Sequence, residues 1–325
     1  MGDGTRDNPY TREDVLRLIK ENGGKAEGLD LSGKIFELDI DLSAKSLRGI
    51  ILRGANLDEA NFENADLTKA DLSEAYLSDT CFEKAELRGA NLSGAYLEYA
   101  QFGEAWMGET NLQKAQLWNT NLERAYLGDA RLDGCDLSHA GLKGIFLHNA
   151  EFTYNTKFGN VDWGDYILEE EKTGCLDLSQ ETYRRLRNWH TQHGIHDVAA
   201  EFYYREKEVT RKSLKWRSKS TFRHRFALEF FRVFFGYGEK WNRILIWMAA
   251  VVFGLAGAYH LWGSFSSSSF PNTLYYSATS FTALGYGHWA PQPTGWAKGV
   301  GVAEAFIGVF MMALLLVTFV RKWTR

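Results

Sequence analysis

The sequence predicts a membrane protein of several domains: a solenoid of short repeats, a helical connector, and two membrane helices with a short re-entrant segment between them. Two features indicate this organisation. Every fifth residue from Leu42 to Phe152 is large and apolar, a period that fits neither a helix nor a strand. Residues 244–297 contain no Lys, Arg, Asp or Glu, although 24% of the whole chain is charged. Such a stretch is typical of chain embedded in lipid.

Composition averaged over the chain conceals the membrane part. A net charge of −4 and a mean hydropathy of −0.32 would suit a soluble protein. The first ten residues are polar, so we expect the N-terminal region to stay in the cytosol. Cys81, Cys135 and Cys175 lack metal-type spacing, and we expect free thiols. The sequence shows no nucleophile–base pair, phosphate loop or metal-ligand cluster, so we expect neither an enzyme nor a cofactor.

Residues 29–165 are predicted to form the solenoid, with two side chains of every five facing inward. The large apolar residue has a small one two positions before it, mostly alanine between Ala55 and Ala150. A narrow shaft cannot hold two bulky layers, and the other positions are polar, as a solvated solenoid requires. Units such as Ala65-Asp66-Leu67 resemble the pentapeptide-repeat family. The resemblance implies a right-handed quadrilateral β-solenoid with four pentapeptides per coil.

Both ends of the solenoid are predicted to be covered. Residues 1–28 contain a capping helix, in which Thr11 to Asp14 form a capping box and the helix stops at Gly23-Gly24. At the other end the period breaks at Lys157, and Phe158 to Trp163 is expected to be a closing turn.

The solenoid is acidic, with a net charge of about −7 over residues 41–160, which we expect to be spread over all faces. Some pentapeptide-repeat proteins are DNA mimics that bind topoisomerases, so a topoisomerase binder with an acquired anchor is one alternative. A rigid spacer, or a docking surface for a cytosolic protein or ligand, is the simpler interpretation, and we expect no nucleic-acid partner. Exposed rings that could mark a contact patch are Tyr76, Tyr96, Trp106, Trp118 and Tyr126.

Residues 166–225 are predicted to hold a helical hairpin and a basic linker. Tyr183 to Glu208 has helical spacing broken at Gly194 and resembles a single tetratricopeptide-like hairpin. Three histidines lie close together there: His190, His193 and His196. Without an acidic or cysteine partner at helical spacing, they are better explained as packed or solvated side chains than as metal ligands.

The linker leads into the membrane. Residues 211–225 carry seven Lys or Arg and no acid, so we expect attraction to anionic lipid of about 1 kcal/mol per charge. Residues 226–243 place aromatic side chains on most faces and are predicted to form an interfacial helix along the inner leaflet.

Residues 244–325 are predicted to form the membrane domain. The outer helix covers residues 244–262, long enough for one crossing, and the inner helix covers residues 296–320. Trp247, Tyr259 and Trp262 suit an aromatic belt. Basic residues flank the pair at both ends, and the loop between is uncharged. The positive-inside rule therefore predicts a multi-pass plasma-membrane protein with both termini in the cytoplasm.

The segment between the two helices carries the most specific motif. Tyr275 to His288 reads Y-Y-S-A-T-S-F-T-A-L-G-Y-G-H, and residues 226–322 resemble the pore domain of the two-transmembrane potassium-channel superfamily. The resemblance implies a homotetramer, a pore helix over residues 273–282 and a filter over residues 283–287, whose backbone carbonyls replace the hydration shell of K⁺. The implied filter residues are Ala283, Leu284, Gly285, Tyr286 and Gly287.

The motif departs from the family pattern, which reads T-T-V-G-Y-G-D where T-A-L-G-Y-G-H stands here. Ala283 lacks the hydroxyl that threonine offers the innermost ion site, and His288 replaces an aspartate at the outer mouth. Conduction of K⁺ or of another monovalent cation therefore stays open. Outside the filter we expect no metal site.

Four residues are expected to serve the filter or the gate. Thr282 and His288 lie beside the filter in sequence. Glu304 is expected to support it, either by hydrogen bonding to Ser277 or Ser280 behind the pore helix or by sensing protons. Gly308 is a candidate gating hinge, or a site of close packing.

The predicted function is the pore-forming subunit of a cation channel, selective for potassium, with a cytosolic solenoid that regulates or scaffolds it. No voltage-sensor helices precede the pore and no ligand-binding domain follows it in this sequence. Regulation is therefore expected through the solenoid, the hairpin and the interfacial helix. The alternative is a membrane-anchored scaffold or binding protein with a non-conducting, pore-like hairpin.

Overall fold

The computed structural model describes residues 2–214, 219–262, 264–265, 269–284 and 293–323. The chain divides into two compact units, Met1–His193 and Gly194–Arg325.

The first unit begins with helix α1 (Arg12–Glu21). Thr11 Oγ1 accepts a hydrogen bond from the backbone N–H of Asp14, and Asp14 Oδ2 accepts one from the backbone N–H of Thr11, both at 3.2 Å. The helix ends where Gly23 and Gly24 adopt positive φ angles. The capping box and the glycine stop predicted from sequence are confirmed. Val15, on the inner side of α1, is buried.

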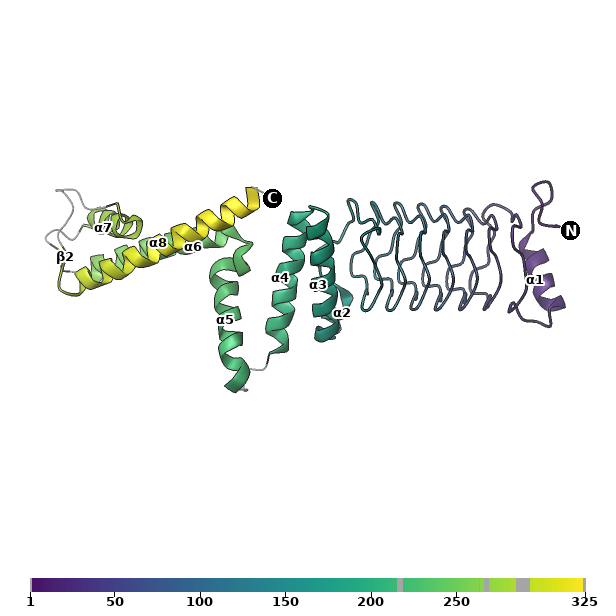
Figure 1. Ribbon diagram of the computed structural model, residues 1–325, viewed down its shortest axis with the longest axis horizontal. Coiled ribbons are helices and arrows are strands. Elements are labelled where there is room, and N and C mark those ends of the chain that lie inside the picture. Colours follow the sequence, from purple (N-terminus) through teal and green to yellow (C-terminus); the bar gives the residue numbers. More distant parts are fainter. Residues whose placement is uncertain (1, 215–218, 263, 266–268, 285–292, 324–325) are drawn as a thin grey trace. The chain divides into compact units, whose positions relative to one another are not determined.

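The repeats form stacked coils in which each residue pairs with the residue 20 positions later. Parallel bridges such as Asp66↔Glu86 and Tyr76↔Tyr96 continue from coil to coil, and Figure 1 shows the resulting stack. Four repeats of five residues therefore make one coil. The large position is buried at every repeat from Leu42 to Leu147, and the small position from Ala55 to Ala150. The predicted interior is confirmed.

The interior departs from the leucine–alanine pattern in two ways, and neither leaves a buried polar group without a hydrogen bond. Three phenylalanines of successive coils stack at 5.2 and 4.8 Å between ring centroids: Phe62, Phe82 and Phe102. Threonine replaces alanine at some small positions and donates its hydroxyl to a carbonyl, as Thr80 does to Leu57 O at 3.0 Å and Thr110 to Leu87 O at 2.9 Å. A buried hydroxyl is tolerated because its hydrogen bond is made.

The C-terminal end of the solenoid differs from the predicted closing turn. Asp136 pairs with Lys157 and Gly141 with Asp162, each 21 residues apart. One extra residue has therefore entered the chain, and the ladder continues beyond it. Phe158 and Trp163 are buried like the earlier large residues, so the segment from Phe158 to Trp163 extends the coil instead of closing it.

Two helices complete the first unit, α2 (Glu169–Lys172) and α3 (Leu176–Gln192). Trp189 donates its indole N–H to Thr153 O at 2.9 Å, and its ring meets Phe158 edge-on at 4.9 Å. His190 is 1% exposed beside these rings, and burial lowers its pKa to about 4, so the imidazole is neutral at pH 7. His190 is thus a packed side chain.

The second unit contains helices α4 (His196–Ser213), α5 (Lys219–Phe235), η1 (Gly236–Gly238), α6 (Trp241–Trp262), α7 (Phe270–Thr282) and α8 (Trp296–Trp323). Two short strands, β1 (Ser264–Phe265) and β2 (Pro293–Thr294), pair antiparallel. α3 and α4 are the helices expected on either side of Gly194, which has a φ of +73°.

The helix expected over residues 226–243 is different in the structure. α5 begins earlier, at Lys219, and stops at Phe235. Gly236, Tyr237 and Gly238 then adopt positive φ angles, which a continuous right-handed helix does not allow. The aromatic segment is therefore a helix followed by a tight turn into α6.

Candidate functional site

α7 packs against two longer helices of the second unit, α6 and α8, and lies beside them in Figure 1. Its 13 residues make a helix about 20 Å long, too short for a hydrocarbon core of about 30 Å. α6 and α8, by contrast, are long and apolar enough to cross a membrane, over Trp241–Trp262 and Trp296–Val320. Pro271 lies in the first turn of α7, and the helix ends at Thr282 because Ala283 adopts a left-handed conformation (φ 52°).

Two glycines let α8 approach α7 closely. A Cβ atom added to Gly308 would lie 1.8 Å from the carbonyl oxygen of Phe281. One added to Gly301 would lie 2.2 Å from the hydroxyl of Tyr276. Gly308, the candidate hinge, therefore occupies a position of close packing inside the continuous helix α8, and its role as a hinge stays a prediction.

A buried carboxylate joins the three helices. Glu304 of α8 is 0% exposed. Its Oε2 accepts a hydrogen bond from the hydroxyl of Tyr259 in α6 at 2.9 Å, and its Oε1 accepts one from Ser277 in α7. The hydrogen bond expected between Glu304 and Ser277 is present. An isolated buried charge would be costly, and these donors lower that cost.

From the sequence, Tyr259 is predicted to belong to an aromatic belt, and its contact with Glu304 is not predicted. Tyr259 is instead fully buried, and its ring meets Tyr276 edge-on at 5.2 Å. Trp262, one turn later, is 72% exposed, as a belt residue would be. The signal that could have found Tyr259 is Glu304 itself, because a single acid in an apolar helix needs hydroxyl donors on the helices that face it.

Further contacts close the far end of this helix group. Strand β1 pairs with β2 through Ser264↔Thr294, and the indole of Trp296 donates to Trp262 O at 3.2 Å. Tyr276 donates to Ala297 O at 3.3 Å. The end of α6 and the start of α8 are therefore held next to each other, and α7 and the G-Y-G motif lie in the sequence between them.

Part of the predicted filter lies within the described residues. Ala283 N–H donates to Ser280 O at 3.1 Å, Leu284 is 82% exposed, and the Thr282 hydroxyl bonds back to Ala278 O at 2.8 Å inside α7. The remaining predicted site residues lie outside the described ones: Gly285, Tyr286, Gly287 and His288. The roles of all of them stay predictions.

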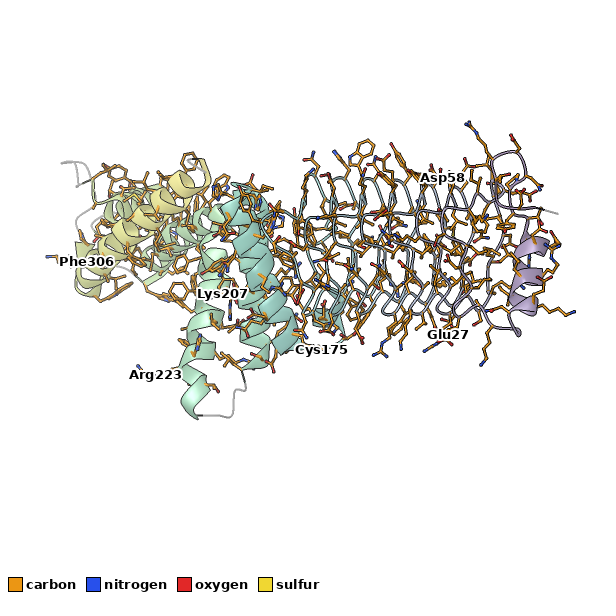
Figure 2. The ribbon with its side chains drawn as sticks, turned by 45° about the vertical axis from the view of Figure 1, so that its right-hand side comes forward. Glu27, Asp58, Cys175, Lys207, Arg223 and Phe306 are labelled. Carbon is orange, nitrogen blue, oxygen red and sulfur yellow. The ribbon has the colours of Figure 1, made fainter. Side chains whose placement is uncertain are left out.

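A large hollow opens beside α7 and α8. A cavity of about 920 Å³ is lined by Thr279, Ser280 and Ala283 and by the apolar side of α8. On this side Phe306, labelled in Figure 2, is 76% exposed and Phe310 is 60% exposed. Exposed apolar surface of this extent marks a place where lipid or protein is bound.

A charged network that the sequence does not predict connects α4 and α5 with the start of α6. Arg211 of α4 forms ion pairs with Glu208 at 3.0 Å and with Glu229 of α5 at 3.1 Å. Tyr237 donates its hydroxyl to Glu208 at 3.0 Å, and burial together with this carboxylate raises the pKa of Tyr237. The network is mostly buried, so solvent screens it less than a surface pair.

The turn after α5 is fixed from both sides. Lys240 pairs with Glu201 of α4 at 2.6 Å. Arg243 donates to Arg232 O at 2.7 Å, and the indole of Trp247 donates to Val233 O at 3.1 Å. A displacement of α4 or α5 would therefore act directly on the first turns of α6.

Two family models match separate parts of the chain. Residues 39–73, 70–107 and 110–149 match pentapeptide repeats, in 8 copies. Residues 244–325 match the ion channel family model. The chain combines pentapeptide repeats with an ion channel domain. Together with the apolar helices α6 and α8, the channel domain indicates a membrane protein.

Solved structures similar to the chain are pentapeptide-repeat proteins. Rfr23 from the cyanobacterium Cyanothece 51142 is 26% identical with a TM-score of 0.24, over 46% of this chain and 97% of that one. QnrB1, a plasmid-mediated fluoroquinolone resistance protein, is 21% identical with a TM-score of 0.18, over 46% and 91%. HetL from the cyanobacterium Nostoc sp. strain PCC 7120 is 22% identical with a TM-score of 0.14, over 47% and 94%. No curated protein matches the chain.

Proposed function

We propose that the chain is the pore-forming subunit of a potassium-selective cation channel, which its pentapeptide-repeat solenoid regulates or scaffolds. The observation that carries this proposal is α7, a helix too short to cross a membrane, packed against two helices that can cross it. Its C-terminal end leads directly into Ala283 and the G-Y-G motif. Helix C-termini carry partial negative charge, which favours a cation there.

In this proposal α7 and the residues after it form a re-entrant pore loop. Non-helical backbone at membrane depth is tolerated only when it is buried in protein or lines a watery cavity. One chain supplies one filter strand, so several copies must surround the ion, and we propose a homotetramer. The exposed apolar side of α8 around Phe306 would face a neighbouring copy. The permeant ion is K⁺, coordinated by carbonyls of residues 283–287.

The proposed topology places the channel in the plasma membrane with both termini and the solenoid in the cytoplasm. The solenoid is right-handed and four-sided. α5 would lie at the inner leaflet, because Phe222, Phe226 and Phe231 are 47%, 58% and 50% exposed. The basic residues of segment 211–225 would attract anionic lipid.

Regulation would reach the pore through the network around Arg211. α4 is tied to α5 through Glu229, and Lys240 ties the start of α6 to α4. Binding of a cytosolic protein or ligand to the solenoid would shift the pore equilibrium only if the ligand prefers one state of this linkage.

Cation flux tests the proposal directly. The purified full chain in liposomes should carry K⁺ faster than Na⁺, and Gly285→Asp should abolish the flux because the side chain blocks the carbonyl pathway. Gly134→Asp is the matched control, since Asp129 already occupies the equivalent left-handed position one repeat earlier. If an assembled, membrane-inserted protein carries no cations, the channel proposal fails and the membrane-anchored scaffold replaces it.

A further inference from the structure

One side of the solenoid, which we call the aromatic-acidic face, consists of residues 35–40, 55–60, 75–80, 95–100, 115–120 and 135–140. The bridges Ile35↔Asn56, Asn56↔Tyr76, Tyr76↔Tyr96, Tyr96↔Gln116 and Gln116↔Asp136 place these segments side by side in consecutive coils. None of them contains Lys or Arg. Every Lys and Arg between Asp41 and Glu151 belongs to one of the other three sides of the coil.

The same face carries seven carboxylates: Glu37, Asp39, Asp58, Glu59, Asp79, Glu98 and Asp136. The net charge that sequence analysis expected on all faces is therefore concentrated on one. The period of five does not reveal this, because the columns of the face appear only when residues 20 apart are aligned. Asp58 is labelled on the outside of the solenoid in Figure 2.

The carboxylates of this face differ from those of the other sides in their partners. Elsewhere acids pair with arginines of an adjacent coil, as in Arg53–Glu74 at 3.1 Å, Arg88–Glu109 at 2.6 Å and Arg124–Glu104 at 2.9 Å. On the aromatic-acidic face, within the part of the chain that the structure describes, Asp136 alone has a basic partner, Lys157 at 2.9 Å. Like charges that are not neutralised repel one another, so the face gains stability when a cation binds.

Aromatic rings lie among these acids. Tyr76 and Tyr96 stack at 4.9 Å with an angle of 4° between their planes. Tyr99 meets Trp118 at 5.7 Å, and Trp118 meets His139 at 6.0 Å. Tyr76, Tyr99 and Trp118 remain 46%, 44% and 38% exposed.

This combination fits guanidinium and ammonium groups. Ring faces attract cations, and an arginine side chain also stacks flat on an aromatic ring. Five coil steps separate Asp39 from His139, about 24 Å at a strand spacing of about 4.8 Å. An extended segment of about seven residues has that length.

We propose that the aromatic-acidic face binds an arginine- and lysine-rich segment of a partner protein. Nucleic acids and anionic lipid surfaces are repelled by its charge. The side that contains Trp106 is a weaker candidate, because Arg48, Lys69 and Arg88 are mixed there with Glu86 and Glu109. The proposal rests on the proposed role of the solenoid as a docking surface and names the chemistry of its partner.

A binding measurement tests the proposal without reference to conduction. The full chain in uncharged detergent is titrated against a fluorescent ten-residue peptide of alternating Arg and Gly, with the same peptide carrying Glu in place of Arg as the negative probe. Fluorescence anisotropy should report binding of the arginine peptide that weakens as salt rises, because screening acts on exposed charges. No binding of the arginine peptide at low salt would overturn the proposal.

Matched charge variants locate the site. The triple variant Glu59→Gln, Asp79→Asn, Glu98→Gln should weaken binding by about tenfold or more, since each exposed pair contributes up to about 1 kcal/mol. The triple variant Glu74→Gln, Glu104→Gln, Glu109→Gln removes the same charge from the other sides and should weaken binding less than twofold. Equal losses in both would mean attraction to net charge only and would overturn the proposal.

A ring variant provides a second, independent readout. Trp118→Ser removes an exposed ring and leaves the shaft unchanged, so folding should be preserved. It should weaken binding of the arginine peptide about threefold or more and of a matched lysine peptide less, because arginine stacks as well as carrying charge. An unchanged affinity for arginine would contradict the role of the rings. These tests measure binding and not flux, so the two proposals can fail separately. A protein that binds the arginine peptide but carries no cations in liposomes would refute the channel proposal and leave the docking face supported.

Discussion

The solenoid and the channel domain bury their interiors in opposite ways. The solenoid repeats one contact, a large residue and a small residue per five, at every position from Leu42 to Leu147. The channel domain depends on contacts that occur once, such as Glu304 between Tyr259 and Ser277 and Gly308 against Phe281. Repeat proteins are stabilised by neighbouring units, so damage to the solenoid should stay local, whereas damage to a single contact in the channel domain should affect the whole helix group.

The largest effect on stability is expected inside the shaft. Leu97→Ala leaves a cavity at a side chain that is 0% exposed and should cost about 2–5 kcal/mol. If the solenoid behaves as stacked units, hydrogen exchange should accelerate in the coils next to Leu97 and remain unchanged in α1. Uniform loss of protection throughout the first unit would contradict the local behaviour.

A control for the shaft comes from the positions where the chain already uses threonine. Ala100→Thr should be nearly neutral, because Thr80 and Thr110 occupy the same position in other repeats and donate to a carbonyl.

The next largest effect is expected at the close contact of α8 with α7. Gly308→Ala places a methyl group 1.8 Å from Phe281 O, so α8 must move, at a cost of about 1–3 kcal/mol. Cation flux should fall at least tenfold, and the melting temperature of the full chain in detergent should fall with it. Gly299→Ala, in the same helix with no atom near the added carbon, should leave both unchanged. Equal behaviour of the two variants would remove the packing argument.

A smaller effect is expected from the carboxylate that joins the three helices. Glu304→Leu removes the Glu304 acceptor from the hydroxyls of Tyr259 and Ser277, although Ser277 can still donate to Val252 O at 2.9 Å, and the loss should cost about 1–2 kcal/mol. Glu304→Gln keeps an acceptor oxygen and should lose less than half of that. Thermal unfolding in detergent measures the difference. If Glu304→Leu is the more stable of the two, the polar connection is not what holds α6, α7 and α8 together.

The smallest effect concerns pH and the first unit. The pKa of buried His190 is lowered to about 4 from an ordinary value of about 6.5, so the unfolded chain binds the proton more tightly. Stability should therefore fall as pH decreases through 6.5, by less than about 1 kcal/mol between pH 7 and 6, and level off below pH 4. Hydrogen exchange of α3 amides measures this. His190→Gln should reduce the dependence, and His139→Gln, at an exposed position, should not.

The two regions also differ in what their sequences reveal. The interior of the solenoid could be predicted position by position, because every repeat places a large and a small residue at the same two positions. The extension past Lys157 could not, since a single inserted residue hides the periodicity of Phe158 and Trp163 although the ladder tolerates it. In the channel domain, the apolar helices and the partner Ser277 followed from hydropathy and from Glu304. Tyr259 did not, because a tyrosine in an apolar helix suits an interface and a core equally well.

The network around Arg211 was hidden for a different reason. Its members come from α4, α5 and the turn at Tyr237, and an ion pair between Arg211 and Glu229 leaves no periodic signal. Gly236 and Gly238, which adopt positive φ angles, could have suggested the break, but the aromatic run around them is typical of one continuous helix.

The register shift at Lys157 implies that the number of residues in the solenoid sets the direction in which the aromatic-acidic face points relative to α3. Deleting or inserting one five-residue repeat between the aromatic-acidic face and α3 would leave the same leucines and alanines inside. It would nevertheless move the carboxylates, relative to α3, to the neighbouring side of the four-sided coil. Insertions of 20 residues, or a multiple of 20, would keep the direction of the face and change only its distance from α3. The docking face could therefore be turned without a change in any interior contact.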